Sequence, residues 1–247
     1  MNIDSRESDI IVCAYAKSEQ LIAGKAEYST KFKGGIFLEA QSFEETGLAD
    51  MPSPRNLNTH LPFRMLPRKH VELNAKIIHM LRNPKDVAVS MFHHVQKDPT
   101  VGGIPIPWNA FFEIFTSKPI PYGSWFDYEK DWERVKKERP NLNIHTVYYE
   151  NLKLNTQAEV KRLGDFLGVS YTDELIEGIC QKVDFKNILK GKTDVSSNFS
   201  TGKLIHALYS RIIGDWKNWF TVAQNEKFDE LYAKEMKDSN LEIRFTQ

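Results

Sequence analysis

The amino-acid sequence predicts a single α/β domain, residues 1–247, with a central parallel sheet flanked by helices. Three short runs rich in Ile, Val and Tyr have the unbroken hydrophobic pattern typical of strands buried on both faces: Asp9–Tyr15, Ala75–Leu81 and Asn143–Tyr149. Helical periodicity lies between them, and this alternation favours parallel strands covered by helices. No shift in composition marks a domain boundary, and a chain of 247 residues, 41% of them hydrophobic, can bury one large core.

The predicted helices begin and end at residues that suit helix termini. In Asp86–Lys97 the apolar side chains recur on one face, and Pro84 lies just before this segment, where its fixed φ suits a first turn. Ser124–Arg139 opens on a good N-cap residue, and Pro140 follows its end. The same periodicity predicts further helices at Trp108–Phe115, Thr156–Leu167, Asp173–Val183 and Val222–Lys237.

The composition limits the classes of function. Lys and Arg together number 33, as do Asp and Glu, so non-specific nucleic-acid binding, which needs a basic excess, is disfavoured. Cys13 and Cys180 fall in a strand pattern and a helix pattern, and both are expected to be buried apolar groups rather than a disulfide. No N-terminal apolar stretch has the length of a signal peptide or a membrane span. We therefore expect a soluble, cytoplasmic protein with no membrane or nucleic-acid partner.

Arg82 and Ser90 are the first candidates for binding an anion. They are the first and last residues of the segment RNPKDVAVS, in which a predicted strand ends and a helix begins. Ligands of open parallel sheets bind outside the carboxyl ends of the strands. There the guanidinium, the hydroxyl and the positive end of the helix would suit a doubly charged phosphate group. The alternative is structural, with Arg82 capping the strand and Ser90 lying on a helix flank.

His60 and the pair Lys17 and Ser18 are weaker candidates. His60 precedes a Leu-Pro turn, and an imidazole can take a proton from a hydroxyl near neutral pH, although a single histidine is more often structural. Lys17 and Ser18 follow the first predicted strand, where an ammonium and a hydroxyl could contact a phosphate. The glycines of a Walker loop are absent, which disfavours a nucleotide kinase.

Five segments in order give the sequence a family resemblance: DIIVCAYAKS, NTHLP, RNPKDVAVS, VYYENL and GDWKNWFTVAQNEKFDELYAKEM. Together they resemble the cytosolic sulfotransferases over nearly the whole chain. The resemblance implies an α/β fold with a central parallel sheet related to the nucleotide kinases (P-loop type). It also implies transfer of a sulfuryl group from 3′-phosphoadenosine-5′-phosphosulfate (PAPS) to a hydroxyl or amine of a small acceptor, such as a phenol, an alcohol or an amine. No metal is required, and no cluster with metal-ligand spacing is present in the sequence.

The resemblance implies roles for individual residues. Arg82 and Ser90 would hold the 3′-phosphate of PAPS, and His60 would deprotonate the acceptor. Lys17 would neutralise the leaving phosphate, with Ser18 beside it.

Further roles follow from two other segments. Tyr149 and Phe185 would flank the adenine, and Arg211 stands two positions from the family's phosphate-binding arginine. A homodimer is implied because four residues fit the family's dimer segment Lys-x₃-Thr-Val-x₃-Glu: Lys217, Thr221, Val222 and Glu226.

The sequence departs from the family near the 5′ end of the donor. The loop around Lys17 lacks the family's Pro, Gly, both Thr and Trp, and Glu19 adds a carboxylate there. Asn58 replaces the lysine of the family's Lys-Thr-His-Leu-Pro, residues 19–35 are atypical, and the N-terminal part is shorter than usual. Two hypotheses stay open: a working sulfotransferase, or a catalytically impaired relative that acts as a dimer partner or a nucleotide binder.

Overall fold

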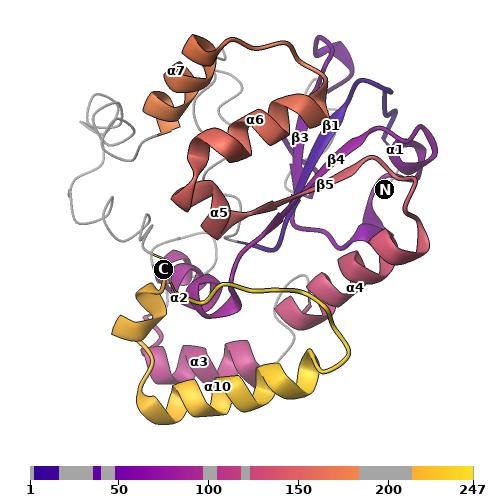
Figure 1. The fold of residues 1–247 in the computed structure, drawn as a ribbon. Helices are drawn as coiled ribbons and strands as arrows, with labels where there is room; N and C mark the ends of the chain where they lie inside the picture. The colour runs from indigo at the N-terminus through magenta and orange to yellow at the C-terminus, as the bar shows by residue number, and fades with distance from the viewer. Residues whose placement is uncertain are drawn as a thin grey trace.

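A parallel sheet forms the centre of the molecule. The computed structural model describes residues 3–16, 36–39, 48–96, 105–117, 123–183 and 213–246, and within them five strands pair in the order β2-β3-β1-β4-β5. All four neighbouring pairs are parallel, so the predicted α/β fold is confirmed (Figure 1). The strands are β1 (Ile10–Ala14), β2 (Ile36–Phe37), β3 (Asn56–Thr59), β4 (Lys76–Leu81) and β5 (Ile144–Tyr148).

β3 is a strand that the hydrophobic pattern does not reveal. Its four residues read Asn-Leu-Asn-Thr instead of forming an apolar run. It nevertheless pairs with β1, with Leu57 opposite Ile11 and Thr59 opposite Cys13. Leu57 is fully buried, so packing and pairing against β1 override the low strand propensity of asparagine. β3 ends immediately before His60, which places that residue at the carboxyl edge of the sheet.

The helices begin at or near the predicted positions. The second helix begins at Pro84, and the Asn83 side chain accepts a hydrogen bond from the Asp86 amide at 2.9 Å. Ser124 is the predicted N-cap and accepts from the Asp127 amide at 3.0 Å. Among the described residues the helices are α1 (Arg68–Glu72), α2 (Pro84–Val95), α3 (Trp108–Ser117), α4 (Trp125–Glu138), α5 (Tyr149–Leu154), α6 (Thr156–Leu167), α7 (Asp173–Val183) and α10 (Val222–Glu235), with 3-10 turns at Leu48–Asp50, Phe63–Met65 and Asp215–Asn218.

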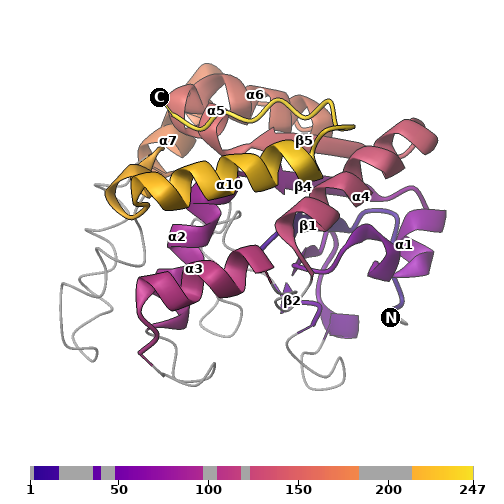
Figure 2. The same cartoon turned by 90° about the horizontal axis from the view of Figure 1, so that it is seen from below.

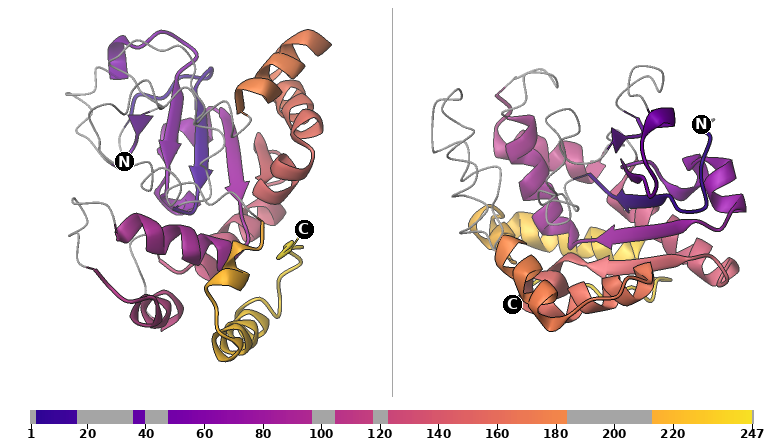
Figure 3. Two further views of the ribbon diagram at one scale, coloured as in Figure 1. Left: turned by 90° about the vertical axis from the view of Figure 1, so that its left-hand side faces the viewer. Right: turned by 90° about the horizontal axis from the view of Figure 1, so that it is seen from above.

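The helices form a layer on each face of the sheet. On one face, α2, α3, α4 and α10 pack with Ile11 and Ile77 around a core rich in aromatic side chains. On the other face, α5 and α6 pack against Val12 and Ile78. Figure 1 shows α5, α6 and α7 grouped together, and Figure 2 shows α3 beside α10. In the left panel of Figure 3, α6 and α7 (salmon to orange) lie beside the strands.

A buried ion pair fixes the amino ends of β1 and β3. Arg55 donates to both carboxylate oxygens of Asp9, at 2.8 and 2.5 Å, and also to the Leu48 and Asp4 carbonyls. Burial acts to raise the pKa of Asp9, but hydrogen bonds from Arg55 and from the Arg6 amide outweigh it, so the pKa lies below its ordinary value. The buried charges are thus satisfied by several partners, as such a pair requires.

A second buried pair joins β4 to α4. Nε2 of His79 lies 3.0 Å from Oε2 of Glu129, and both side chains are fully buried, with the imidazole stacked on Trp132. Burial lowers the pKa of His79 well below its ordinary value and raises the pKa of Glu129 well above its own, because each charged form is desolvated. Both shifts favour the uncharged form of the group.

The two cysteines differ in burial. Both are free thiols. Cys13 is buried in β1, as predicted, whereas Cys180 is half-exposed, so the expectation of a buried Cys180 is wrong. The reason is the position of α7 at the edge of the molecule, where Ile176 alone among its described side chains is buried.

Candidate functional site

Most of the segment RNPKDVAVS holds the fold together rather than facing a ligand. Asp86 is buried and accepts hydrogen bonds from the amides of Gly214 at 2.8 Å and Trp216 at 3.0 Å. Burial raises the pKa of Asp86, although Arg82 and these amides oppose the shift. Lys85 bonds Asp229 at 2.5 Å and lies 4.3 Å above the Trp216 ring. Lys85 and Asp86 therefore clamp the start of α2 to the turn that precedes α10.

The C-terminal tail strengthens this clamp. The extended segment after α10 runs back towards α2 (Figure 1), where the Phe245 carbonyl accepts a hydrogen bond from Nε1 of Trp216 at 2.8 Å. The Phe245 ring lies 5.3 Å from Nζ of Lys85 and 5.2 Å from the Tyr232 ring. Three segments far apart in the sequence are thus joined at the carboxyl edge of the sheet.

Arg82 stands at this edge, directly after the last residue of β4. Its side chain is 1% exposed, and its guanidinium carbon lies 4.2 Å from the centre of the Tyr149 ring. Its carbonyl accepts from Nε1 of Trp125 at 3.2 Å. A guanidinium stacked on an aromatic face has its donors in the plane of the group, a geometry that suits a planar or tetrahedral anion. Ser90, 9% exposed, lies in the second turn of α2, so the structure places both predicted phosphate ligands on elements that meet at this edge.

Tyr149 has a different local setting from the one the sequence suggests. It was expected at the end of a strand, but it is the first residue of α5 and is fully buried. The next residue, Glu150, accepts from the Asn83 amide at 2.9 Å, which ties α5 to the end of β4. Burial raises the pKa of Glu150. The stacking of Tyr149 on Arg82 supports the guanidinium; contact with adenine stays a prediction.

His60 lies at the same edge, after β3. Its Nδ1 is 3.0 Å from the carbonyl oxygen of Ala14, the last residue of β1. A carbonyl only accepts hydrogen bonds, so Nδ1 is the donor, and in the neutral imidazole this tautomer leaves the lone pair on Nε2. The imidazole is half-buried and lies 5.0 Å from the Phe37 ring. His60 thus has the tautomer that a base acting through Nε2 requires.

The strand order brings these groups together. β1 lies between β3 and β4, so His60 and Arg82 follow strands that are two spacings apart, or about 10 Å. Lys17, Ser18, Phe185 and Arg211 lie outside the described residues, as does the atypical segment 19–35. Sequence reasoning missed Glu39, which accepts from the His60 amide at 2.7 Å; it stands in the segment IFLEA beside β2, whose two residues give no strand signal.

The four residues of the predicted dimer segment are exposed. Val222 is the most exposed of the large apolar side chains described, at 76%, on the first residue of α10. Thr221 caps this helix, since its hydroxyl accepts from the Gln224 amide at 3.2 Å. Lys217 and Glu226, at the two ends of this segment, are also exposed.

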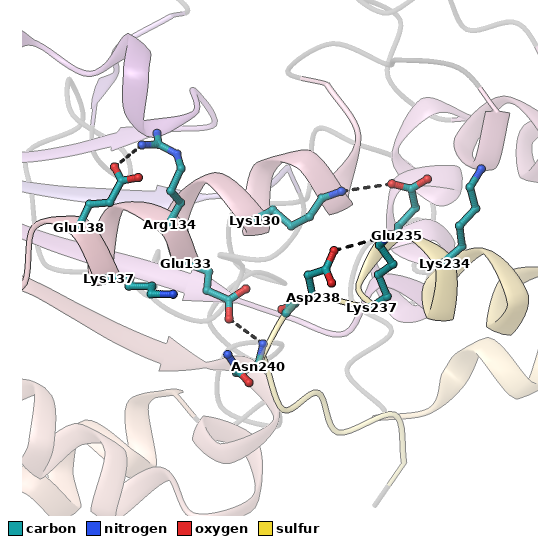
Figure 4. A pocket seen from close by; sticks show the side chains of 11 residues that line it. Lys130, Glu133, Arg134, Lys137, Glu138, Lys234, Glu235, Lys237, Asp238 and Asn240 are labelled. Atoms are coloured by element: carbon teal, nitrogen blue, oxygen red, sulfur yellow. Dashed lines mark hydrogen bonds and ion pairs between the residues drawn. The ribbon is translucent and has the colours of Figure 1, made fainter.

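A charged groove of about 820 Å³ lies away from this edge, between α4 and the end of α10 (Figure 4). Its walls carry both signs of charge, and several side chains pair across or along it, including Lys130 with Glu235 at 3.2 Å and Arg134 with Glu138 at 2.5 Å. Glu133 accepts from the Asn240 amide at 2.7 Å. None of the predicted site residues lines the groove, so we assign the site to the sheet edge on chemical grounds.

The described residues lack two features that would point to other classes of protein. No helix there is both long and apolar enough to cross a membrane. Nor does that part of the chain bring three His, Cys, Asp or Glu side chains together in a way that could hold a metal ion.

The combination at the sheet edge defines a class of protein: an α/β enzyme with a buried cation, a hydroxyl and an oriented imidazole, suited to transferring an anionic group. A family model described as the sulfotransferase domain matches residues 38–240. The match includes His60, Arg82, Ser90 and Tyr149, and begins after Lys17 and Ser18.

Individual relatives agree. The chain is 34% identical to dog (Canis lupus familiaris) sulfotransferase 1B1 over 262 residues, covering 97% of this chain and 87% of the dog protein. It is 38% identical to bovine (Bos taurus) sulfotransferase 1E1 over 206 residues, which cover 80% of this chain and 67% of the bovine protein.

Solved structures also match. Mouse sulfotransferase SULT7A1, complexed with PAP, superposes with a TM-score of 0.77 at 31% identity, covering 96% of this chain and 87% of the mouse chain. A retinol dehydratase in complex with retinol and PAP has a TM-score of 0.73 at 19% identity, covering 97% of this chain and 84% of that chain, and shows the same fold. This chain belongs to the sulfotransferase family, and its reaction is the transfer of a sulfuryl group.

Proposed function

We propose that the protein transfers a sulfuryl group from PAPS to a hydroxyl or amine of a small acceptor, at the edge formed by the carboxyl ends of β1, β3 and β4. The observation that carries this proposal is the orientation of His60. Its Nδ1 donates to the Ala14 carbonyl. His60 follows β3, which is two strand spacings from β4, the strand that ends just before the buried Arg82. The His60 imidazole suits the role of the base, and the Arg82 guanidinium suits the binding of a phosphate.

In the proposed reaction, Nε2 of His60 takes the proton of the acceptor hydroxyl. The acceptor oxygen forms a bond to sulfur while the bond from sulfur to the oxygen of the 5′-phosphate breaks, and 3′-phosphoadenosine-5′-phosphate (PAP) leaves. Such transfers depend mainly on positioning and on stabilising charge on the leaving oxygen. We assign the stabilisation of charge on the leaving oxygen to Lys17, with Ser18 beside it.

The nucleotide would be held at its far end by Arg82 and Ser90. A hydrogen bond to a charged group contributes about 1.5–3 kcal/mol, so two bonds from a buried guanidinium would contribute about 3–6 kcal/mol to binding of a 3′-phosphate. Tyr149 would support Arg82 from one side, as its stacking distance of 4.2 Å suggests. Adenine contacts from Tyr149 and Phe185, and a phosphate contact from Arg211, belong to the same proposal.

We also propose a cytoplasmic homodimer joined through the exposed segment 217–226. The support for this proposal is the match of the segment to the family's dimer pattern, together with the exposure of Val222 at 76%. Lys217 and Glu226 can pair with their symmetry mates across a two-fold axis. No metal takes part in the proposed chemistry.

The test is incubation with radiolabelled PAPS and a panel of phenols, alcohols and amines. We expect labelled product with at least one acceptor class. Substituting His60→Gln should lower kcat by about 10²–10⁴-fold, the usual effect of removing a general base. His145→Gln, on β5 and stacked on Phe166, is the matched control and should keep the activity. Absence of transfer to every acceptor, with PAP still bound, would instead favour a catalytically impaired nucleotide binder.

A further inference from the structure

We propose that Glu39 is a positioning residue for His60: its carboxylate fixes the backbone at the end of β3, and so holds the imidazole against β1 in the orientation needed for proton transfer. This inference rests on the proposed function of His60 as the base. Glu39 lies just beyond β2, at the same edge of the sheet.

Both carboxylate oxygens of Glu39 accept hydrogen bonds from the end of β3. Oε1 accepts from the His60 amide at 2.7 Å, and Oε2 accepts from the Thr59 hydroxyl at 2.9 Å. The Thr59 hydroxyl in turn accepts from the Leu61 amide at 3.0 Å. The Glu39 carboxylate therefore binds Thr59 and His60 directly, and Leu61 through the Thr59 hydroxyl.

A carboxylate is the group that fits this arrangement. It is acceptor-only when ionised, and it faces one N–H and one O–H donor. Hydrogen bonds to a charged acceptor are shorter and stronger than neutral ones, which agrees with the 2.7 Å contact to the His60 amide. The oxygen of a glutamine side chain would still accept a hydrogen bond from the His60 amide. Its NH₂ group would then face the Thr59 hydroxyl and could not accept a hydrogen bond from it.

His60 is held at both its backbone and its ring. The Glu39 bond holds the His60 backbone, and the Ala14 carbonyl holds Nδ1 of its ring at 3.0 Å. Fixing both ends sets the direction of Nε2 as well as the tautomer. A displacement of a reacting group by about 1 Å can lower a rate by about 10²-fold, so loosening the backbone is enough to affect catalysis.

The activity test compares Glu39→Gln and Glu39→Ala with the wild type. We expect kcat to fall by about 3–10-fold in the glutamine variant and by about 10–100-fold in the alanine variant, which is the usual range for partners that orient a functional group. KM for PAPS and the Kd of PAP should stay within about threefold, since the hydrogen bonds that Glu39 makes are to Thr59 and His60. Glu72→Ala, an exposed carboxylate paired with Arg68 on α1, is the control.

A readout independent of turnover separates this proposal from the proposed function. Nitrogen NMR of isotope-labelled histidine, with the His60 signal assigned by its loss in His60→Gln, reports the tautomer directly. We expect a single Nδ1-protonated form in the wild type and a mixture of tautomers in Glu39→Ala.

The outcomes are distinct. A wild-type enzyme with no transfer activity would overturn the proposed function, and the NMR result would still decide the role of Glu39. Equal losses in kcat and PAP affinity, or an unchanged His60 tautomer in Glu39→Ala, would show that Glu39 is only structural and would overturn the inference.

Discussion

The clamp centred on Asp86 makes a quantitative prediction. Substituting Asp86→Ala removes the acceptor of three N–H donors: the Gly214 and Trp216 amides at 2.8 and 3.0 Å, and Nδ2 of Asn83 at 2.8 Å. A buried donor left without a partner costs about 1–3 kcal/mol, so the two backbone amides alone cost about 2–6 kcal/mol. Asp86 is itself 1% exposed, and removing its desolvated charge offsets part of this loss. We expect the free energy of unfolding to fall by about 2–4 kcal/mol.

Urea unfolding followed by fluorescence measures this change. The Asp86→Asn variant keeps one acceptor oxygen and should lose about half as much as Asp86→Ala. Asp238→Ala is the matched control, because this aspartate is 87% exposed and its ion pair with Lys237 spans 3.8 Å. A loss below about 0.5 kcal/mol in Asp86→Ala, or one equal to that of the control, would refute the reasoning.

Three further predictions follow from the described contacts. Burial raises the pKa of Glu129 above its ordinary value of 4.5 and lowers the pKa of His79 below its ordinary value of 6.5, so the pair stabilises the fold most between these two values. Above about pH 6.5 the unfolded chain has lost the Glu129 proton that the folded protein retains, so stability falls as the pH rises. The Glu129→Gln variant should lose less stability than the wild type above this pH in urea unfolding, and parallel curves would contradict this. Val222→Glu should convert the proposed dimer to a monomer in light scattering, and an unchanged mass would exclude segment 217–226 as the interface. Asp9→Asn should cost about 3–5 kcal/mol in urea unfolding because it leaves the 2% exposed Arg55 without its charged partner, and a change below about 1 kcal/mol would show that the pair is not needed.

The parts of the fold that the sequence predicts are those with strong periodic patterns. β1 and β4 are almost fully buried and therefore read as apolar runs. In β5 only Val147 is buried, and the strand is found from its β-branched and aromatic residues. The helices α6 (Thr156–Leu167) and α7 (Asp173–Val183) have the predicted bounds. β3 could not be found this way, because a strand of four residues with two asparagines depends on pairing with β1 rather than on its own composition.

The candidate site also contains residues that the sequence predicts and residues that it does not. Arg82 is predictable because it directly follows a strong strand signal and precedes a helix that starts with Pro84. His60 could be singled out only by the family resemblance, because its strand is hidden. Glu39 had no local signal, since its role comes from hydrogen bonds to residues 20 and 21 positions later in the chain. Tyr149 was assigned to the right region but to the wrong element.

A crystal structure of the protein with PAP and a phenolic acceptor would decide whether His60, Arg82 and Ser90 form one active site. We expect the 3′-phosphate to lie within about 3 Å of both the Arg82 guanidinium and the Ser90 hydroxyl, with the acceptor oxygen facing Nε2 of His60. A nucleotide bound elsewhere, or an acceptor oxygen that cannot reach His60, would contradict it.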